Sequence, residues 1–130
     1  MLGKYKRKTS RPTNSREEEF EQIKTINFLR LQYPRVLFTI SPAGIRLHPA
    51  VGSKFKRMGY RAGTPDIMIF EPNKYFHGLF IELKRIKGGI VSDNQQDFLN
   101  HLQANGYAAE VANGHVEAIK IIKNYLGDKK

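Results

Sequence analysis

Residues 66–84 of the chain read DIMIFEPNKYFHGLFIELK, with two apolar runs on either side of a polar segment. The runs Asp66–Phe70 and Gly78–Lys84 have the length and the apolar content of β-strands. Because the connection 71–76 is short and polar, we predict that the two strands pair as an antiparallel hairpin. The remaining segments can be arranged around this hairpin.

The segments before the hairpin predict a helix, a strand and a loop. Ser15–Glu18 has the spacing of a capping box, and Pro34 ends the helical pattern that follows it. The apolar residues of this helix that recur at helical intervals are Phe20, Ile23, Ile26, Leu29 and Tyr33, and Phe28 and Leu31 widen their surface. Residues 36–40 predict a buried strand, and the stretch up to Pro65 predicts a loop with a short helical turn at 53–58.

The segments after the hairpin complete an α/β pattern. Ser92 is predicted to cap a helix that runs to about Asn105, residues 107–112 form a strand, and a last helix ends at Gly127. This order predicts an α/β fold with a mixed central sheet of about four strands flanked by helices. The 130 residues fit one domain, 15–127, with a basic arm at 1–14 and a tail at 128–130. The arm is either a flexible phosphate-binding segment or simply solvated.

The composition limits the partners and the chemistry. A net charge of +10 favours a polyanion, either nucleic acid or an acidic membrane surface. The absence of cysteine excludes disulfides, thiolate zinc sites and thiol nucleophiles. No apolar run is long enough to span a bilayer, and no signal peptide opens the chain, so we expect no membrane partner and a cytoplasmic location.

The predicted hairpin brings charged residues together on one face of the sheet. Alternation along the second strand places Glu82 and Lys84 on the same face, and Asp66 begins the neighbouring strand. Two carboxylates at such a short distance repel each other, and a divalent cation would relieve the repulsion. Oxygen ligands without cysteine or paired histidines favour Mg²⁺ or Mn²⁺. The alternative is that Asp66 caps a turn while Glu82 and Lys84 form an ion pair at the sheet edge.

Several motifs of the chain resemble one nuclease family. Pro65-Asp66, followed after a gap by Glu82-Leu83-Lys84, resembles the PD-(D/E)xK nuclease signature. The flanks resemble the virus-type replication-repair nuclease (VRR-NUC) domain, with the matches Gly63–Ile67 (G-x-P-D-I), Gly78–Lys84 (G-L-x-I-E-x-K) and Ser92–Gln95 (S-x-x-Q). In the first helix, Glu18 and Gln22 match the acidic-then-Gln pattern of the family, and the resemblance runs from about Glu18 to Leu126.

The resemblance implies a restriction-endonuclease-like core and a divalent-metal phosphodiesterase. Asp66, Glu82 and Lys84 would be catalytic, and Glu18 and Gln95 would have helper roles, with Glu18 reaching the metal through water. The metal would be held by Asp66 and Glu82, with the backbone carbonyl of Leu83 as a further candidate ligand. Where relatives often have an Asn-Gly element, this chain has Pro42-Ala43-Gly44, which puts substrate contacts of that loop in doubt.

The two helper residues also have simpler interpretations. Glu18 could only close the capping box at Ser15, and Glu17, Glu19 and Glu21 compete with it for the catalytic role. Gln95 stands three residues after Ser92 and could likewise be only a cap partner. The histidines have no spacing typical of metal ligands, and we expect surface or packing roles for them.

The resemblance further implies a homodimer that acts on branched DNA such as four-way (Holliday) junctions, in a DNA repair role in a bacterial or phage-infected cell. No small-molecule cofactor is expected. The candidate DNA-binding residues are Arg46, Lys54, Lys56, Arg57, Arg61 and Lys87. Two alternatives remain, a non-catalytic basic nucleic-acid-binding module and a PD-(D/E)xK nuclease that cleaves linear or flap DNA.

Overall fold

The computed structural model describes residues 13–42 and 49–129. The expectations for most of the basic arm, for Arg46 and for residues 43–44 lie outside the described residues. The elements, in chain order, are α1 (Thr13–Gln32), β1 (Phe38–Ile40), α2 (Pro49–Met58), β2 (Ile67–Ile69), β3 (Leu79–Lys84), α3 (Asp93–Ala104), β4 (Ala108–Asn113) and α4 (His115–Leu126).

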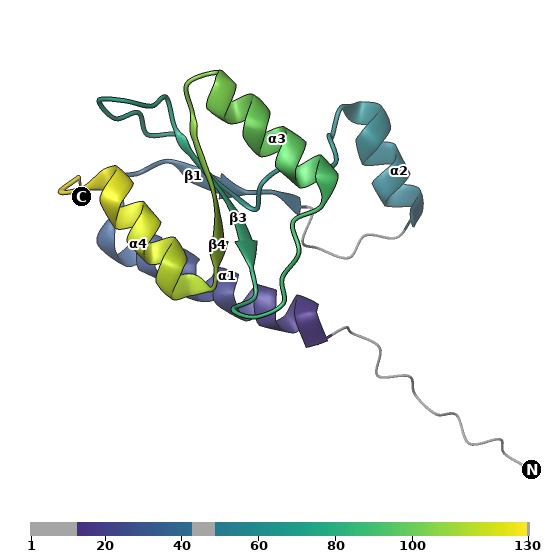
Figure 1. The fold of residues 1–130 in the computed structure, drawn as a ribbon, viewed down its shortest axis with the longest axis horizontal. Helices are drawn as coiled ribbons and strands as arrows, with labels where there is room; N and C mark the ends of the chain where they lie inside the picture. Colours follow the sequence, from purple (N-terminus) through teal and green to yellow (C-terminus); the bar gives the residue numbers. More distant parts are fainter. Residues whose placement is uncertain (1–12, 43–48, 130) are drawn as a thin grey trace, which may run out of the picture.

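Within the described residues, the strands form one four-stranded mixed sheet in the order β1-β2-β3-β4. β2 pairs antiparallel with both β1 and β3, whereas β4 pairs parallel with β3. The predicted hairpin is therefore confirmed, and its register places Ile67 opposite Ile81. The mixed sheet flanked by helices confirms the α/β prediction (Figure 1).

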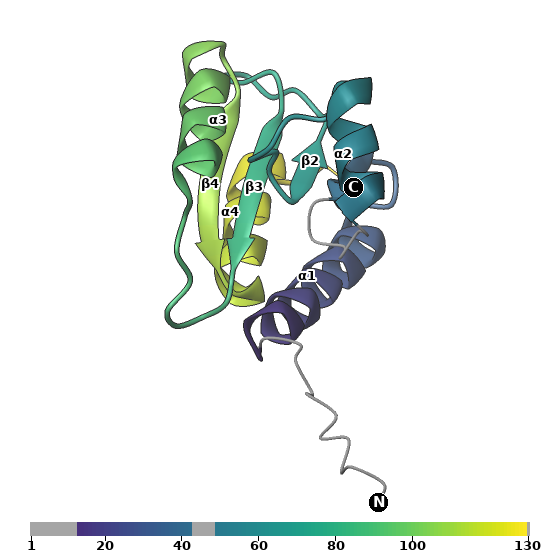
Figure 2. The same ribbon diagram turned by 90° about the vertical axis from the view of Figure 1, so that its right-hand side faces the viewer.

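The alternation along β3 sends its side chains into two separate cores. Leu79, Ile81 and Leu83 belong to the larger core, which is closed by residues of α1 and α4. Phe80 packs on the opposite face with Leu99 of α3. All six residues of β3 are buried, because helices cover both faces of this strand (Figure 2). The side chains of Glu82 and Lys84, which share the face of Phe80, are thereby taken out of solvent.

Helix α1 differs from its prediction in its boundary and in its buried face. It begins at Thr13, two residues before the predicted start at Ser15. Phe20 and Ile23 are 55% and 52% exposed, whereas Glu21, Thr25 and Leu29 are buried. The buried contact of this part of α1 with α4 is made by the Glu21 carboxylate, which accepts from His115, whereas the Phe20 ring packs edge-on against His115 and stays 55% exposed.

The segment between the first two strands also differs from its prediction. The expected short turn at 53–58 is part of a ten-residue helix, α2, with no buried residue. β1 was expected to be buried, but its residues Thr39 and Ile40 are exposed, since it is the outermost strand of the sheet. An apolar sequence alone does not distinguish an outer strand from a central one.

The buried carboxylate of Glu21 caps α4 from another helix. Gly114, which precedes α4, provides no side-chain cap. Instead, Glu21 accepts hydrogen bonds from the backbone N–H and from Nδ1 of His115. Burial acts to raise the pKa of Glu21, but the hydrogen bonds and charge of His115 outweigh it and hold the pKa below its ordinary value of 4.5. This contact joins the first and last helices of the domain.

We expect Glu21→Ala to lower the free energy of unfolding by about 2 kcal/mol, because it leaves a helix N-terminus without its acceptor. Because the folded pKa is depressed, this contribution is present above the ordinary pKa and is lost as the pH falls through the folded value. Urea denaturation at neutral and acidic pH measures both effects. Glu19→Ala, at an exposed site on the same helix, is the control, and equal losses for the two variants would refute the capping role.

Candidate active site

The hairpin brings Asp66 and Glu82 next to each other at the start of β2. The register continues from Ile67 opposite Ile81, so Asp66 lies across from Glu82. The Oδ2 atom of Asp66 accepts a hydrogen bond of 2.7 Å from the backbone N–H of Leu83. This bond takes the place of a backbone bond to β3 just before β2 begins, and it fixes the Asp66 carboxylate beside that of Glu82.

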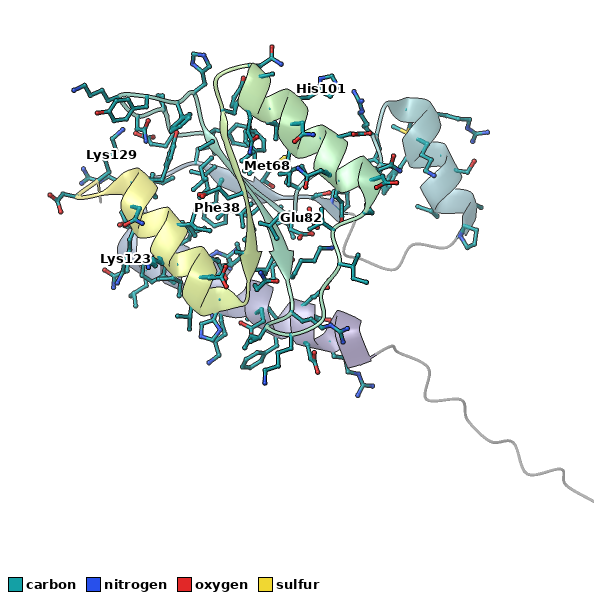
Figure 3. The ribbon with its side chains drawn as sticks, viewed as in Figure 1. Phe38, Met68, Glu82, His101, Lys123 and Lys129 are labelled. Atoms are coloured by element: carbon teal, nitrogen blue, oxygen red, sulfur yellow. The ribbon has the colours of Figure 1, made fainter. Side chains whose placement is uncertain are left out.

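The side chain of Glu82 is held by two further polar residues. Gln95 Nε2 donates a hydrogen bond of 2.8 Å to Glu82 Oε1, and Lys84 Nζ lies 3.4 Å from the same oxygen. Glu82 is 2% exposed and Lys84 is 7% exposed. Figure 3 shows Glu82 near the N-terminal end of α3, to which Gln95 belongs. The predicted catalytic residues Asp66, Glu82 and Lys84 therefore lie together with Gln95.

The electrostatics of the pair favour a bound proton when no cation is present. Burial raises the pKa of Glu82 to about 8, the charge of Asp66 adds to this increase, and the charge of Lys84 opposes it. Burial also raises the pKa of Asp66, although the Leu83 N–H acts in the opposite direction. With a pKa of about 8, the Glu82 carboxyl would be mostly protonated at neutral pH when no cation is bound. A divalent cation could take the place of this proton.

The donor set fits a cation that keeps several water molecules. Among the residues that the structure describes, Glu82 Oε2 is buried without a hydrogen-bond donor, so one oxygen is available to a ligand. In the same residues, no three histidine or acidic side chains form a cluster that could enclose an ion by themselves. Two carboxylates and waters suit Mg²⁺, which dehydrates reluctantly, and also Mn²⁺, which prefers the same ligands.

The Leu83 carbonyl lies on the side of the strand that faces this pair. The N–H and C=O of one strand residue point toward the same neighbouring strand, and the Leu83 N–H is directed at Asp66. Consistently, the next carbonyl, that of Lys84, accepts from Gly114 N–H on the opposite side. The geometry therefore leaves the Leu83 carbonyl as a candidate ligand.

Glu18 of α1 is the acidic residue of that helix that reaches the site. Burial raises the pKa of Glu18. The charge of Lys84 acts to lower this pKa, and the charge of Asp66 acts to raise it. Its neighbours Glu17 and Glu19 are exposed, and Glu21 contacts His115 instead. Among the four candidates on α1, Glu18 is thus the one whose carboxylate interacts with the predicted catalytic residues.

Gln95 both closes the capping box of α3 and contacts the predicted catalytic residue Glu82. Its backbone N–H donates to Ser92 Oγ, and its Oε1 accepts from the Ser92 N–H, so the predicted capping box is confirmed. Its Nε2 is left to donate to Glu82. The capping box therefore fixes the orientation of the amide that contacts the catalytic pair.

Glycines explain how these segments approach so closely. Gly63 has a φ of +90°, and a Cβ atom there would lie 2.4 Å from the backbone oxygen of Asn94. A side chain at this position would push the Asp66 loop away from the first turn of α3. A Cβ at Gly89 would lie 2.7 Å from the Cβ of Lys84. These positioning roles were missed by the sequence analysis, although Gly63 was visible in the G-x-P-D-I match.

The basic residues expected to bind DNA are exposed. Those on α2 are Lys54, Lys56 and Arg57, and Arg61 and Lys87 lie in the loops after α2 and β3. The Cζ atom of Arg61 lies 6.0 Å from the centroid of the Phe98 ring. Of the histidines, His115 has the packing role described above, and no sequence pattern predicted its contact with Glu21.

The fold and the acidic hairpin define a nuclease-type α/β domain. The VRR-NUC domain family matches residues 41–116 of the chain. A solved structure titled "VRR_NUC domain protein" is 30% identical, with a TM-score of 0.73, and the alignment covers 85% of this chain and 88% of that chain. This protein belongs to the VRR-NUC family, as the motifs predicted. A search among curated proteins gave no match.

A nuclease domain implies DNA as the substrate, in agreement with the net charge of +10. In the part of the chain that the structure describes, no helix combines the length and the apolar character needed to cross a membrane.

We expect the metal-free protein to lose stability as the pH rises from about 4.5 to about 8, because Glu82 keeps its proton in the folded state and loses it in the unfolded state. Glu82→Gln removes this ionisation and should flatten the profile. Thermal unfolding in EDTA across this pH range measures how the stability of each protein depends on pH. If the stability of the wild type and of Glu82→Gln changed with pH in the same way, the raised pKa of Glu82 would be contradicted.

Proposed function

We propose that this protein is a divalent-metal-dependent endodeoxyribonuclease whose catalytic residues are Asp66, Glu82 and Lys84. The observation that supports the proposal is the half-buried Asp66 carboxylate beside the buried side chains of Glu82 and Lys84, on the hairpin that carries the family's motifs. A buried pair of acids costs stability unless it serves a purpose, and binding a cation is the purpose that fits its oxygens.

In the proposed function, each residue of the site has a different role in phosphodiester hydrolysis. Asp66 and Glu82, with the Leu83 carbonyl, would hold Mg²⁺ or Mn²⁺, which supplies an acidified water and polarises the phosphate when bound. The Nζ of Lys84, close to Glu82, would neutralise the negative charge that grows on the phosphate in the transition state. Gln95 would keep the Glu82 carboxylate in position. The partly buried carboxylate of Glu18 would hold a water near Lys84.

A non-catalytic DNA-binding module is the main alternative. It would explain the net charge of +10, but it would give the paired carboxyl groups of Asp66 and Glu82 no role. Negative charge in a surface that binds phosphates also weakens binding unless a cation neutralises it. Metal-dependent cleavage separates the two proposals.

We expect Asp66→Asn and Glu82→Gln each to lower cleavage of plasmid DNA by at least about a thousandfold and to weaken Mn²⁺ binding. Lys84→Ala should slow cleavage by a similar order while leaving Mn²⁺ binding nearly unchanged, because its charge acts on the transition state. Single-turnover cleavage and titration calorimetry measure the two quantities.

Glu110→Ala is the matched control, since Glu110 is an exposed acid on the strand next to β3. Glu110→Ala should retain both DNA cleavage and Mn²⁺ binding. Near wild-type cleavage by either carboxamide variant at saturating metal would remove that residue from the proposed site.

We further propose that the working form is a homodimer that prefers branched DNA, such as a four-way junction, to linear duplex. Symmetric cleavage of a junction needs two active centres, and a two-fold dimer provides them. The face of α1 opposite the buried Leu29 carries Phe20, Ile23 and Leu31, with Leu31 77% exposed. An apolar stripe of this kind is typical of a surface that is covered by another chain.

Sedimentation at micromolar concentration, with a panel of linear, flap, fork and four-way substrates, tests this proposal. We expect a dimer that Leu31→Glu converts to a monomer, and faster cleavage of the junction than of the linear duplex. Val116→Glu, at an exposed apolar residue of α4, is the control. A wild-type monomer that cleaves linear and four-way DNA equally fast would leave the nuclease in place and exclude the junction preference.

A further inference from the structure

A pocket beside α3 is distinct from the carboxylate pair and combines rings with polar groups. Its volume is about 500 Å³, within the range of small-molecule sites. α3 contributes Phe98, His101 and Leu102, which lie on one flank of the helix at spacings of three and four residues, and the C-cap residue Asn105 follows them. The remaining wall includes Arg61, His77 and Tyr107.

Two rings of this pocket, those of Tyr107 and His77, pack against neighbouring groups. The Tyr107 ring packs edge-on against Phe80, with 5.4 Å between centroids, and against His77, with 5.5 Å between centroids. A Cβ at Gly106 would lie 2.8 Å from the His77 ring, so the backbone turn also supports that ring. A flat ligand could therefore bind with little loss of side-chain entropy.

The pocket begins close to the proposed catalytic centre. Phe98 follows Gln95 by three residues, which corresponds to roughly 4.5 Å along the helix axis, and Gln95 contacts Glu82. Arg61 lies two residues before Gly63, whose backbone touches the first turn of α3. In Figure 3, His101 lies toward the opposite end of α3 from Glu82. A strand with its scissile phosphate at Glu82 could thus place a base of a nearby nucleotide in the pocket.

The chemistry of the lining matches an unpaired nucleobase. Proteins bind unpaired bases by stacking them on aromatic rings and on arginine planes, and by hydrogen bonds to the base edges. The Arg61 guanidinium lies 6.0 Å from the Phe98 ring, and the exposed His77 and His101 offer ring nitrogens. We propose that this pocket binds one unpaired base of the DNA strand beside the scissile phosphate, an inference that rests on the proposed nuclease function. Such a pocket would select DNA with unpaired bases.

The test measures binding in EDTA, so that cleavage plays no part. A fluorescent single-stranded oligothymidylate is titrated with the full chain, and Phe98→Leu should weaken its binding by about tenfold, the effect of losing one base–aromatic stack. Phe98→Tyr, which keeps the ring, should bind as the wild type does. Arg61→Lys, which keeps the charge at an exposed site but loses the planar group, should weaken binding several-fold.

Tyr75→Leu is the matched control, because the exposed Tyr75 ring also has a cation nearby, Lys74 Nζ, 5.5 Å from its centroid. It should leave oligothymidylate binding unchanged, and blunt duplex should bind Phe98→Leu and wild type equally. Equal losses for Phe98→Leu and Tyr75→Leu, or an equal loss on blunt duplex, would overturn the proposal. Because no metal is present, an intact Phe98 effect in a protein that fails to cleave would reject the nuclease and keep the pocket.

Photo-crosslinking locates the base directly. With 5-iodouracil in the same oligothymidylate, we expect the cross-linked peptide to include Phe98 or Tyr107. Cross-linking confined to peptides that lack every residue of the pocket would overturn the assignment.

Discussion

The placement of two carboxyl groups side by side, with Glu82 buried and Asp66 half-buried, is the constraint on which the rest of this structure depends. Asp66 and Glu82 meet just before β2 begins, opposite the middle of β3, and the N–H of Leu83 holds the Asp66 carboxylate in place. Burial and mutual repulsion raise the pKa of Glu82 to about 8. A pair of this kind is costly to the folded protein, and the surrounding elements supply the contacts that compensate for it.

Those contacts come from segments that are distant in the sequence. α3 supplies the amide of Gln95, and the absence of a side chain at Gly63 lets the Asp66 loop lie against that helix. α1 supplies Glu18, and its position depends on Glu21, which fixes the helix to the N-terminus of α4. The site is therefore assembled by nearly the whole domain, and a change in any of these packing contacts should alter the geometry of the carboxyl pair.

Local patterns predicted the central part of this arrangement well. The hairpin, the faces of β3 and the Ser92 capping box follow from alternation, a short connection and a cap spacing, and these depend on neighbouring residues only. The buried face of α1 could not be obtained in this way, because periodicity favoured Phe20 and Ile23 whereas the structure buries Glu21. The partner of Glu21 is His115, on a helix at the other end of the chain, and no local pattern encodes such a contact. For the same reason the pocket at Phe98, which is formed by separate segments, was not predicted.

In the function that we propose, a divalent cation replaces the proton that Glu82 holds beside Asp66. Calorimetric titration of Mn²⁺ at pH 7, repeated in buffers with different ionisation enthalpies, measures the protons released on binding. Since the pKa of Glu82 is about 8 without metal, wild-type protein should release about one proton per ion, and Glu82→Gln should bind Mn²⁺ far more weakly. Binding without proton release, or binding of equal strength by Glu82→Gln, would contradict the account.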